Sequence, residues 1–428
     1  MKRYAIVGTG GRARTFIDAI LGPHRETAEL VGLCDQSRTR LEYHAAETRR
    51  LFPHAPAAAA FGSEQFDQMV RQTRPDAIIV TTIDCLHHHY VIRAMELGCD
   101  AITEKPMTVD AEKAKAILDA IRRTGRHLRV MFNYRYQNGV GQVKKLVLDG
   151  RIGKPTAVDF AWTLDTSHGA DYFRRWHREK DKSGGLLVHK ASHHFDLINW
   201  WIDSYAQRVF CMGDLKFYGR QNAEARGQHY PYNRYTGEPA AKDDPFALRL
   251  DSDPSLRGLY LNAEADSGYI RDRNVMGEPI TIEDTMAITA RYRNGVILNY
   301  SLIAYSPWEG LRVAITGDKG RLEFFEKHSS HIITGKSEEG HTSELPASLT
   351  LYPMFKPPEA IEIPPAAGPH GGGDAVMLEA IFKPNGHADP LGRDATHIDG
   401  LASILVGISA NESIRTGMPV DCDTIIAI

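Results

Sequence analysis

A glycine-rich turn near the start of the chain limits its fold more than any other feature. The apolar run Tyr4–Val7 leads directly into Gly8-Thr9-Gly10-Gly11-Arg12-Ala13, which fits the pattern G-x-G-x-x-A. In this pattern the first glycine allows a tight turn and the second lets the backbone approach a pyrophosphate. The following helix points its positive end at that anion. The turn therefore predicts a strand, a phosphate-binding loop and a helix in immediate succession.

An acidic residue at the end of the next apolar run extends this prediction. Asp35 follows Leu30–Cys34, and an acid about 20 residues beyond the glycines is typical of a dinucleotide-binding Rossmann fold, whereas the glycines alone also fit an ordinary turn. Its carboxylate would accept hydrogen bonds from the adenosine ribose and repel a 2′-phosphate, which favours NAD. Arg38 and Arg40 lie just downstream and could instead bind that phosphate, so NADP stays open.

Alternating strands and helices fill residues 1–125, which we predict to be an NAD-binding domain of the α/β class. The residues of its first half predicted to contact the cofactor are Gly8, Gly10, Gly11, Arg12 and Asp35. A doubly wound parallel sheet is expected from this alternation. Besides the two runs above, we expect strands at 77–82 and 101–103 and helices at 14–21, 38–50, 90–97 and 111–123.

The pattern changes after Gly125, and residues 126–428 predict an α+β domain for substrate binding and oligomerisation. We expect a mostly antiparallel sheet from short strands at 128–132, 156–163, 209–212, 286–292, 296–302 and 312–316, with a turn at Asn294-Gly295. Residues 213–279 support no long element and are interpreted as an insertion over the site or at a subunit contact. A long helix is predicted at 395–416.

Three motifs together resemble one family. Gly8-Thr9-Gly10, the run Thr81-Thr82-Ile83-Asp84-Cys85-Leu86-His87 and Glu104-Lys105-Pro106-Met107 are similar to the Gfo/Idh/MocA family of glucose-fructose oxidoreductases and inositol dehydrogenases, over nearly the whole chain. The resemblance implies a large open sheet in the second domain. It also implies that Lys105 is the catalytic lysine, that Pro106 shapes its turn, and that Glu104, Thr82 and His87 line the cofactor. Without the motif, Lys105 would read as a solvated surface charge.

A histidine-rich stretch departs from the family pattern. Members typically read G-G-x-x-x-D-x-G-x-H-x-x-D. In the stretch from Gly184, His193 takes the histidine position and Asp196 the last acidic one, whereas His189 replaces the first acid. We expect a helix from Val188 that puts His189 and His193 on one face. The two could serve a sugar site as an imidazole base, bind a metal, or be satisfied core histidines. The first is favoured, because H-x-x-x-H without a glutamate and a third ligand is a poor zinc signal, so we predict no metal.

Aromatic and cationic side chains near this stretch suggest a carbohydrate subsite. Aromatic faces stack on a pyranose, and arginine or histidine can bond its hydroxyls. A solvated loop anchored by Trp176 is the alternative reading. Residues 369–374 are expected to form a polar loop that could cap the pocket. The residues predicted to contact substrate are Tyr134, Arg135, Tyr172, Arg175, Trp176, His177, Lys190 and Asp196.

Composition excludes several classes of protein. The formal net charge is -3, without the basic patch of a nucleic-acid binder. No apolar run is long enough to span a bilayer, and no signal-peptide core follows Met1, so we expect a cytoplasmic protein with no membrane partner. A homo-oligomer, a dimer or tetramer, is expected because the exposed face of an open sheet commonly needs covering.

The leading functional hypothesis is an NAD-dependent oxidoreductase acting on a sugar or glycoside. A hydroxyl-bearing carbon would give hydride to the nicotinamide, while Lys105 and His193, helped by His189, take the proton. The alternative is a redox-neutral glycosidase that retains NAD through oxidation, elimination, water addition and reduction. A third hypothesis, a module that only senses NADH, is disfavoured by the intact Glu104-Lys105-Pro106.

Overall fold

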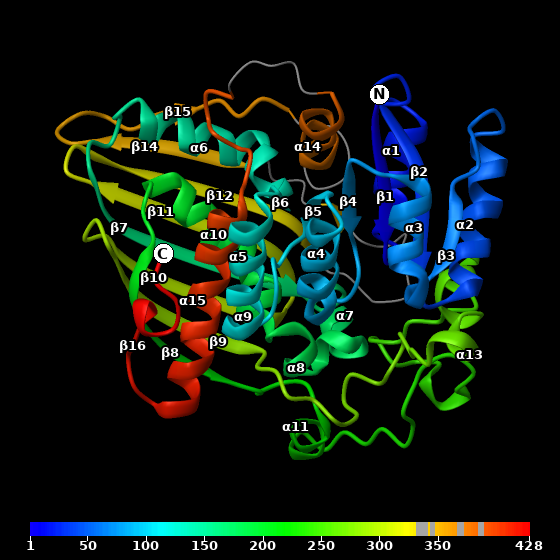
Figure 1. The fold of residues 1–428 in the computed structure, drawn as a ribbon. Helices are drawn as coiled ribbons and strands as arrows, with labels where there is room; N and C mark the ends of the chain where they lie inside the picture. Colours follow the sequence, from blue (N-terminus) through cyan, green and yellow to red (C-terminus); the bar gives the residue numbers. More distant parts are fainter. Residues whose placement is uncertain (331–340, 343–346, 366–371, 384–388) are drawn as a thin grey trace. The chain divides into compact units, whose positions relative to one another are not determined.

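The chain forms two compact units, and each is described by itself. The computed structural model describes residues 1–330, 341–342, 347–365, 372–383 and 389–428 (Figure 1). The first unit comprises Met1–Asn133, Leu250–Arg271 and Gly372–Leu401, and the second comprises Tyr134–Arg249, Asp272–Gly371 and Ala402–Ile428.

A six-stranded parallel sheet forms the centre of the first unit, which confirms the predicted doubly wound architecture. Its order is β3-β2-β1-β4-β5-β6, the Rossmann order. The residues of β4 and the last four of β1 are buried, as expected for strands covered on both faces. The strands are β1 (Lys2–Val7), β2 (Ala28–Asp35), β3 (Ala59–Gly62), β4 (Ala77–Val80), β5 (Asp100–Glu104) and β6 (Leu128–Met131).

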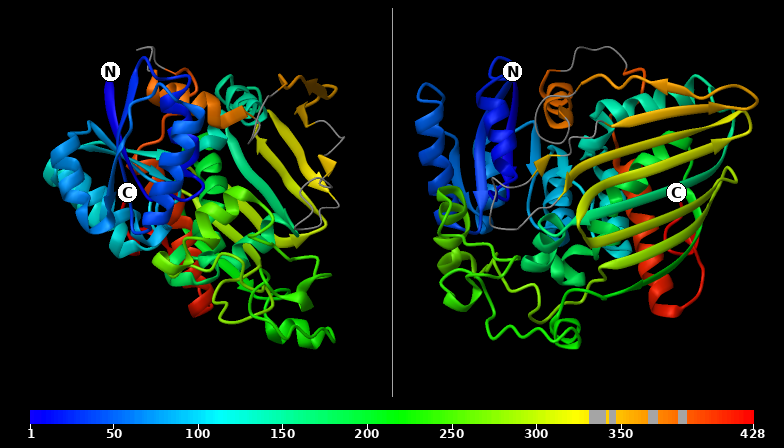
Figure 2. Two further views of the ribbon diagram at one scale, coloured as in Figure 1. Left: turned by 90° about the vertical axis from the view of Figure 1, so that its right-hand side faces the viewer. Right: turned by 180° about the vertical axis from the view of Figure 1, so that it is seen from behind.

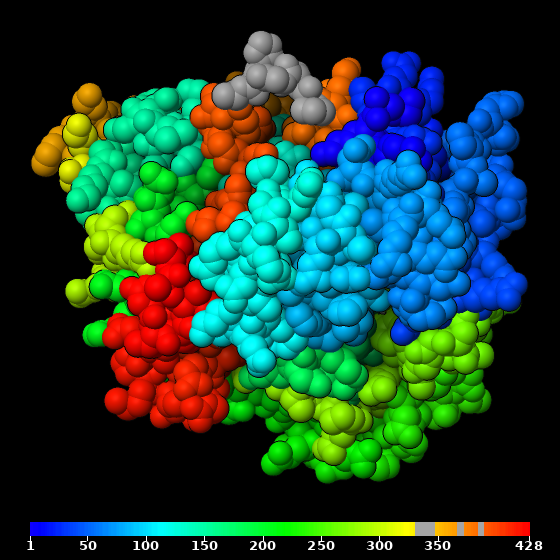
Figure 3. All heavy atoms as spheres, viewed as in Figure 1, coloured from blue at the N-terminus to red at the C-terminus, as the bar shows by residue number. Residues whose placement is uncertain are grey.

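Helices connect these strands and cover the sheet. The side chains of α3, α4 and α5 form a continuous layer, coloured blue to cyan in Figure 3. Gly125 ends α5 with a left-handed φ of 65°, where a glycine is favoured. The connecting helices are α1 (Ala13–Leu21), α2 (Arg38–Leu51), α3 (Phe66–Thr73), α4 (His87–Glu96) and α5 (Ala111–Thr124).

The strand predicted at 128–132 does not open the second domain. As β6 it pairs in parallel with β5, Ala101 opposite Leu128, at the edge of the Rossmann sheet. A short apolar run carries no information about strand direction, whereas the α5 crossover from β5 brings the chain back parallel. The first unit therefore extends to Asn133 rather than to residue 125, and α14 (Gly373–Phe382) joins it through an edge-to-face contact of Phe382 with Tyr4.

A ten-stranded sheet forms the second unit, in the order β15-β14-β12-β11-β7-β10-β9-β8-β16 with β13 beside β12. Among the described strands, β7 and β10 pair in parallel and the other neighbours pair antiparallel, which confirms the mostly antiparallel prediction. The strands are β7 (Pro155–Asp165), β8 (Ala206–Asp214), β9 (Thr285–Tyr292), β10 (Ile297–Ser306), β11 (Trp308–Gly317), β12 (Gly320–Ser330), β13 (His341–Thr342), β14 (Ser348–Pro353), β15 (Glu359–Ile361) and β16 (Val420–Asp421).

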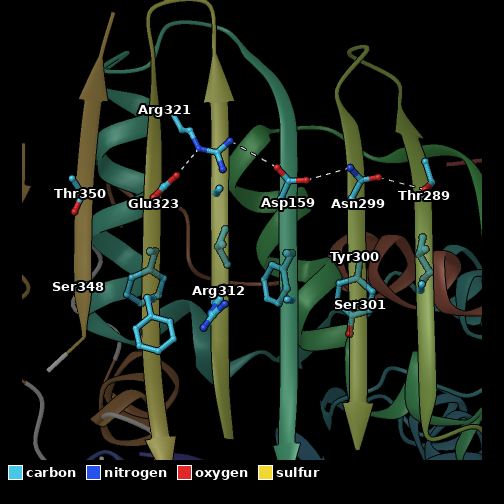
Figure 4. A pocket seen from close by; sticks show the side chains of 18 of the residues that line it. Asp159, Thr289, Asn299, Tyr300, Ser301, Arg312, Arg321, Glu323, Ser348 and Thr350 are labelled. Atoms are coloured by element: carbon cyan, nitrogen blue, oxygen red, sulfur yellow. Dashed lines mark hydrogen bonds and ion pairs between the residues drawn. The ribbon is translucent and has the colours of Figure 1, made fainter. Parts of the chain in front are cut away.

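Helices pack on one face of this sheet, and its other face is open in the right-hand view of Figure 2. The covering helices include α6 (Asn138–Leu148), the wholly buried α10 (Ala191–Ile202) and much of α15 (His397–Thr416). A hollow of about 860 Å³ lies on the sheet. A polar row crosses it, in which Asp159 accepts a hydrogen bond from Asn299 and faces Arg321, which bonds Glu323 (Figure 4).

The segment 213–279 contains only short helices, as expected. It divides between the units, since Leu250–Arg271 belongs to the first. Its elements include α11 (Arg220–Ala225), α12 (Pro254–Leu256), a π-helical turn (Arg257–Leu261) and α13 (Glu264–Ser267). Within the described residues, none of the helices has the length and apolar character that crossing a membrane requires.

Candidate functional site

The glycine turn has the geometry that its motif predicts. Gly8 adopts a φ of 88°, and a Cβ built there would lie 2.6 Å from the backbone nitrogen of Thr82. Only glycine fits this close approach, which is reinforced by the Thr81 hydroxyl donating to the Gly8 carbonyl at 2.6 Å. The turn and the start of α1 thus lie at the carboxyl edge of the sheet, where Rossmann folds hold a dinucleotide.

Asp35 lies beside this turn, at the end of β2. Its carboxylate accepts hydrogen bonds from the backbone N–H groups of Thr9, at 2.6 Å, and Ser37, at 2.8 Å. These two bonds fasten the glycine turn to the loop after β2, a positioning role that the sequence did not predict. Since each carboxylate oxygen has two lone pairs, both can still accept a bond from a ribose hydroxyl.

Arg12 and Glu104, both predicted to contact the cofactor, bind each other. Arg12 Nε donates to Glu104, and an Nη atom lies 3.1 Å from Asp374 Oδ1. Burial lowers the pKa of Arg12, but the two carboxylates outweigh it and raise the pKa overall. Asp374 was expected in a loop at 369–374. Residues 369–371 lie outside the described part, whereas Gly373 and Asp374 begin α14.

Lys105 lies one residue beyond β5 and is half-buried, with a cis peptide bond to Pro106. His87 is buried beside this turn, with Nδ1 at 2.8 Å from the Pro106 carbonyl and Nε2 at 3.2 Å from the Thr82 carbonyl. Burial lowers the pKa of His87. The ring thus lies between two loops of the carboxyl edge. A neutral imidazole has a single N–H and can donate to only one of these carbonyls, and a cofactor contact by His87 stays a prediction.

The helix predicted from Val188 is interrupted. His189 ends α9 (Leu186–His189), His193 lies in the first turn of α10, and Lys190 separates them. At this junction the His193 N–H donates to the carbonyl of Lys190, and Ser192 Oγ donates to that of His189. A serine that bonds a nearby carbonyl competes with the helical pattern. The prediction of one continuous helix face was therefore wrong.

Four predicted residues bring their rings together in what we call the imidazole cluster: Tyr172, Trp176, His177 and His189. Trp176 stacks on His177 with ring centroids 3.6 Å apart, and His177 meets His189 at 4.2 Å. Tyr172 lies 5.4 Å from each histidine. Flat apolar faces beside imidazole nitrogens suit the faces and hydroxyls of a sugar.

Lys190 joins two further predicted residues. Its Nζ donates to the Tyr134 hydroxyl at 3.1 Å and lies 4.6 Å from the ring centroid of Trp162. The His193 ring stacks on Tyr134 at 4.3 Å. Lys190 is only 2% exposed, and this burial lowers its pKa from 10.5 to about 8 although Glu309 and Asp165 act in the opposite direction. An amine with such a pKa can exchange protons near neutral pH.

A chain of hydrogen bonds extends from Tyr172 through the partly exposed His168 to the buried Glu309, and sequence reasoning missed it. The Tyr172 hydroxyl lies 2.9 Å from His168 Nε2, and His168 Nδ1 lies 2.8 Å from Glu309. Burial raises the pKa of Glu309, but His168 and Lys190 outweigh it and lower the value to about 2. Glu309 comes from β11, 141 residues after His168, and no motif marks it.

Three predicted substrate residues are engaged elsewhere in the fold. Arg135 and Asp196 were expected to contact substrate, but they form a bidentate ion pair at 2.8 and 2.6 Å and are almost fully buried. Arg175 donates to Asp171 at 2.8 Å. Among the described residues, no group of three or more histidine, cysteine, aspartate or glutamate side chains could hold a metal.

Comparison with known proteins agrees with this anatomy. A model described as "Oxidoreductase family, NAD-binding Rossmann fold" (GFO_IDH_MocA) matches residues 2–132, and its "C-terminal alpha/beta domain" matches 144–422. YteT of Bacillus subtilis (strain 168), whose name assigns it to the oxidoreductases, is 34% identical over 98% of this chain and 97% of its own length.

Other relatives match over shorter stretches. The D-glucoside 3-dehydrogenase of Escherichia coli (strain K12) is 28% identical over 36% of this chain and 40% of its own. Glycosyl hydrolase family 109 protein 1 of Akkermansia muciniphila is 28% identical over 35% of this chain and 31% of its own length. The crystal structure of the Caulobacter crescentus aldose-aldose oxidoreductase, 17% identical, covers 98% of this chain and 99% of its own with a TM-score of 0.64, which shows the same fold. The chain therefore belongs to the Gfo/Idh/MocA oxidoreductase family, as an NAD(P)-dependent oxidoreductase with a Rossmann domain and a C-terminal α/β domain.

Proposed function

We propose that this protein oxidises a hydroxyl group of a sugar or glycoside with NAD. The observation that carries the proposal is the position of Lys105, directly after β5 at the carboxyl edge of the Rossmann sheet, the same edge as the glycine turn after β1. A lysine there can act on a hydroxyl whose carbon faces the nicotinamide. The E. coli relative named as a D-glucoside 3-dehydrogenase supports a sugar substrate.

The chain would bind and orient the sugar and move its proton. Lys105 takes the hydroxyl proton, with His193 as a second acceptor and His189 assisting. The imidazole cluster stacks on the sugar ring through Trp176, which is half-buried. Lys190 holds the Tyr134 hydroxyl and so orients the ring on which His193 stacks. When bound, the cofactor supplies the hydride acceptor.

A panel of free sugars and glycosides tests the proposal. Incubation with NAD+ should produce NADH, measured by absorbance, with at least one of these compounds. Lys105→Met should lower kcat by about 10²- to 10⁴-fold, the range for a lost general base, while exposed Lys242→Met serves as the matched control. Unchanged turnover in Lys105→Met would return the protein to the class of modules that only sense NADH.

A redox-neutral glycosidase is the second candidate, for two reasons. The Akkermansia relative carries a glycosyl hydrolase name, and the Leu250–Arg271 segment bonds the glycine turn through Tyr260, a contact suited to retaining the dinucleotide between turnovers. Glycoside cleavage without net NADH, together with NAD(H) released from purified protein by heat denaturation, is the result expected of this reaction. Stoichiometric NADH from a free sugar would exclude it in favour of the dehydrogenase.

A second copy of the chain is the occupant we propose for the open face of the second sheet. The hollow there combines the polar row at Asp159 with apolar groups, including Met212 on β8, which is 68% exposed. Light scattering should give a dimer or tetramer, and Met212→Asp should weaken it. A monomer at all concentrations would overturn this assignment.

A further inference from the structure

The segment Leu250–Arg271 belongs to the first unit and packs against its glycine turn, although the two are distant in sequence. The N–H of Gly11 donates to the Tyr260 hydroxyl at 2.9 Å. Arg40 Nε donates to the carbonyl of Leu259, also at 2.9 Å. Gly258 approaches α2 so closely that a Cβ there would lie 2.4 Å from the Tyr43 ring. The segment therefore packs as an integral part of the first unit, against both the glycine turn and α2.

An acid of this segment binds the start of α2. Asp266 Oδ1 accepts a hydrogen bond from the Ser37 hydroxyl at 2.7 Å, and Oδ2 accepts one from the Thr39 N–H at 2.9 Å. Burial raises the pKa of Asp266, but the bonds from Thr39 and Ser37 lower it overall, so the group is ionised at neutral pH. Ser37 and Thr39 come just after Asp35, where a 2′-phosphate on the adenosine ribose would need donors. Asp266 uses those donors itself.

The two arginines that could have received a 2′-phosphate have other partners. Arg38 is exposed and donates to Glu42 at 2.7 Å, one turn along α2. Arg40 is buried, donates to Leu259, and lies 3.7 Å from Asp35. Arg40 is therefore held by other groups, whereas Arg38 pairs with Glu42 only at the exposed surface.

Tyr260 lies at the glycine turn, where the pyrophosphate of a dinucleotide binds, whereas Asp266 lies at the ribose end of the site. Its ring lies under two guanidinium groups, with Arg271 Cζ 4.4 Å and Arg40 Cζ 5.6 Å from the centroid. A tyrosine hydroxyl that accepts the Gly11 N–H can still donate its own proton. The Tyr260 hydroxyl can therefore bond a phosphate oxygen held at the glycine turn.

We propose that Leu250–Arg271 forms the outer wall of the dinucleotide site, in which Asp266 together with Asp35 excludes the 2′-phosphate of NADP and Tyr260 binds the pyrophosphate. The proposal rests on the proposed NAD dependence and adds the residues outside the Rossmann motif that select the cofactor. Two carboxylates near one ribose repel a phosphate dianion more strongly than Asp35 alone.

Isothermal titration calorimetry with NAD+ and NADP+ tests Asp266 without any substrate. The unaltered protein should bind NAD+ at least about 100-fold more tightly than NADP+. Asp266→Asn keeps an oxygen that can accept the Thr39 N–H but removes the charge, and should narrow this ratio by about tenfold, mainly by tightening NADP+. Asp251→Asn, at an exposed acid of the same segment, is the matched control and should leave the ratio unchanged.

Tyr260→Phe tests the pyrophosphate contact. It keeps the ring that the two arginines cover and removes only the hydroxyl, so it should weaken NAD+ and NADP+ alike, by about three- to tenfold. An unchanged ratio in Asp266→Asn, or unaltered affinity in Tyr260→Phe, would overturn the assignment of that residue. Equal binding of NAD+ and NADP+ by the unaltered protein would overturn the selectivity itself. Failure to bind any dinucleotide would instead refute the proposed function.

Discussion

Lys190→Met removes a cation from the interior of the second unit, and its effect on stability should depend on pH. The lysine is 2% exposed, and burial lowers its pKa from 10.5 to about 8. Below about pH 8 the folded protein carries a charged, desolvated amine, whereas the unfolded chain carries a hydrated one. As pH rises, the folded protein loses this proton before the unfolded chain does, so stability should increase with pH over this interval.

The magnitude follows from these two pKa values. The charged lysine destabilises the folded state by about 3 kcal/mol at pH 7 and by about 1 kcal/mol at pH 10. The Trp162 ring, 4.6 Å from Nζ, favours the charged form by about 1 kcal/mol. The difference in free energy of unfolding between Lys190→Met and the unaltered protein should therefore change by about 1 to 2 kcal/mol between pH 7 and pH 10.

Urea unfolding at pH 7 and pH 10 measures this difference, because tyrosines and other groups that titrate in the interval cancel between the two proteins. Lys242→Met, at an exposed lysine of the same unit, provides the control and should show the same difference from the unaltered protein at both pH values. If the free energies of unfolding of Lys190→Met and the unaltered protein also differ equally at pH 7 and pH 10, Lys190 is not desolvated in the folded state and cannot supply a neutral amine near pH 8.

Three further substitutions test other parts of the structure. Gly8→Ala should weaken NAD+ at least tenfold in calorimetry, because its Cβ would lie 2.6 Å from Thr82; unaltered affinity would contradict the turn geometry. Asp196→Asn leaves Arg135 buried without its carboxylate and should cost about 3 to 5 kcal/mol in urea unfolding, whereas a loss below about 1 kcal/mol would make the pair dispensable. Glu309→Gln should lower the free energy of unfolding by about 3 kcal/mol at pH 7, because the pKa of Glu309 lies near 2 rather than 4.5. This loss should shrink as pH falls from 4.5 towards 2. A loss that does not change with pH would exclude the link between this carboxylate and stability.

Much of the first unit could be predicted, because its signals are local. The glycine turn and the cap at Gly125 each act within a few residues of the element that they shape, whereas the bond of Asp35 to Thr9, 26 residues away, was not predicted. The sheet assignment of 128–132 failed, since strand direction is set by the α5 crossover and not by the run itself. The third strand, β3, and α3 were not predicted at all.

The same distinction between local and long-range signals applies to the candidate site. Tyr172, Trp176, His177 and His189 lie within one short stretch of sequence, and the structure brings their rings into one cluster. That this cluster is a carbohydrate subsite stays a prediction. Arg135 and Asp196 are 61 residues apart, and nothing in the sequence indicates that their charges neutralise each other. Partners contributed by distant strands and helices, such as Glu309 and Asp374, follow from the tertiary fold alone.

Cofactor choice shows why a motif read by itself stays ambiguous. From the sequence, Asp35 favoured NAD while Arg38 and Arg40 kept NADP open. The structure gives both arginines other partners and brings Asp266 to Ser37 from a segment 229 residues away. On the proposal above, selectivity is shared between the end of β2 and an insertion that the Rossmann motif does not include. A relative with the same Asp35 but without this segment should therefore discriminate less strongly against NADP, and grafting Asp266 alone should not restore selectivity, because the carboxylate depends on the contacts at Leu259 and Tyr260 for its position.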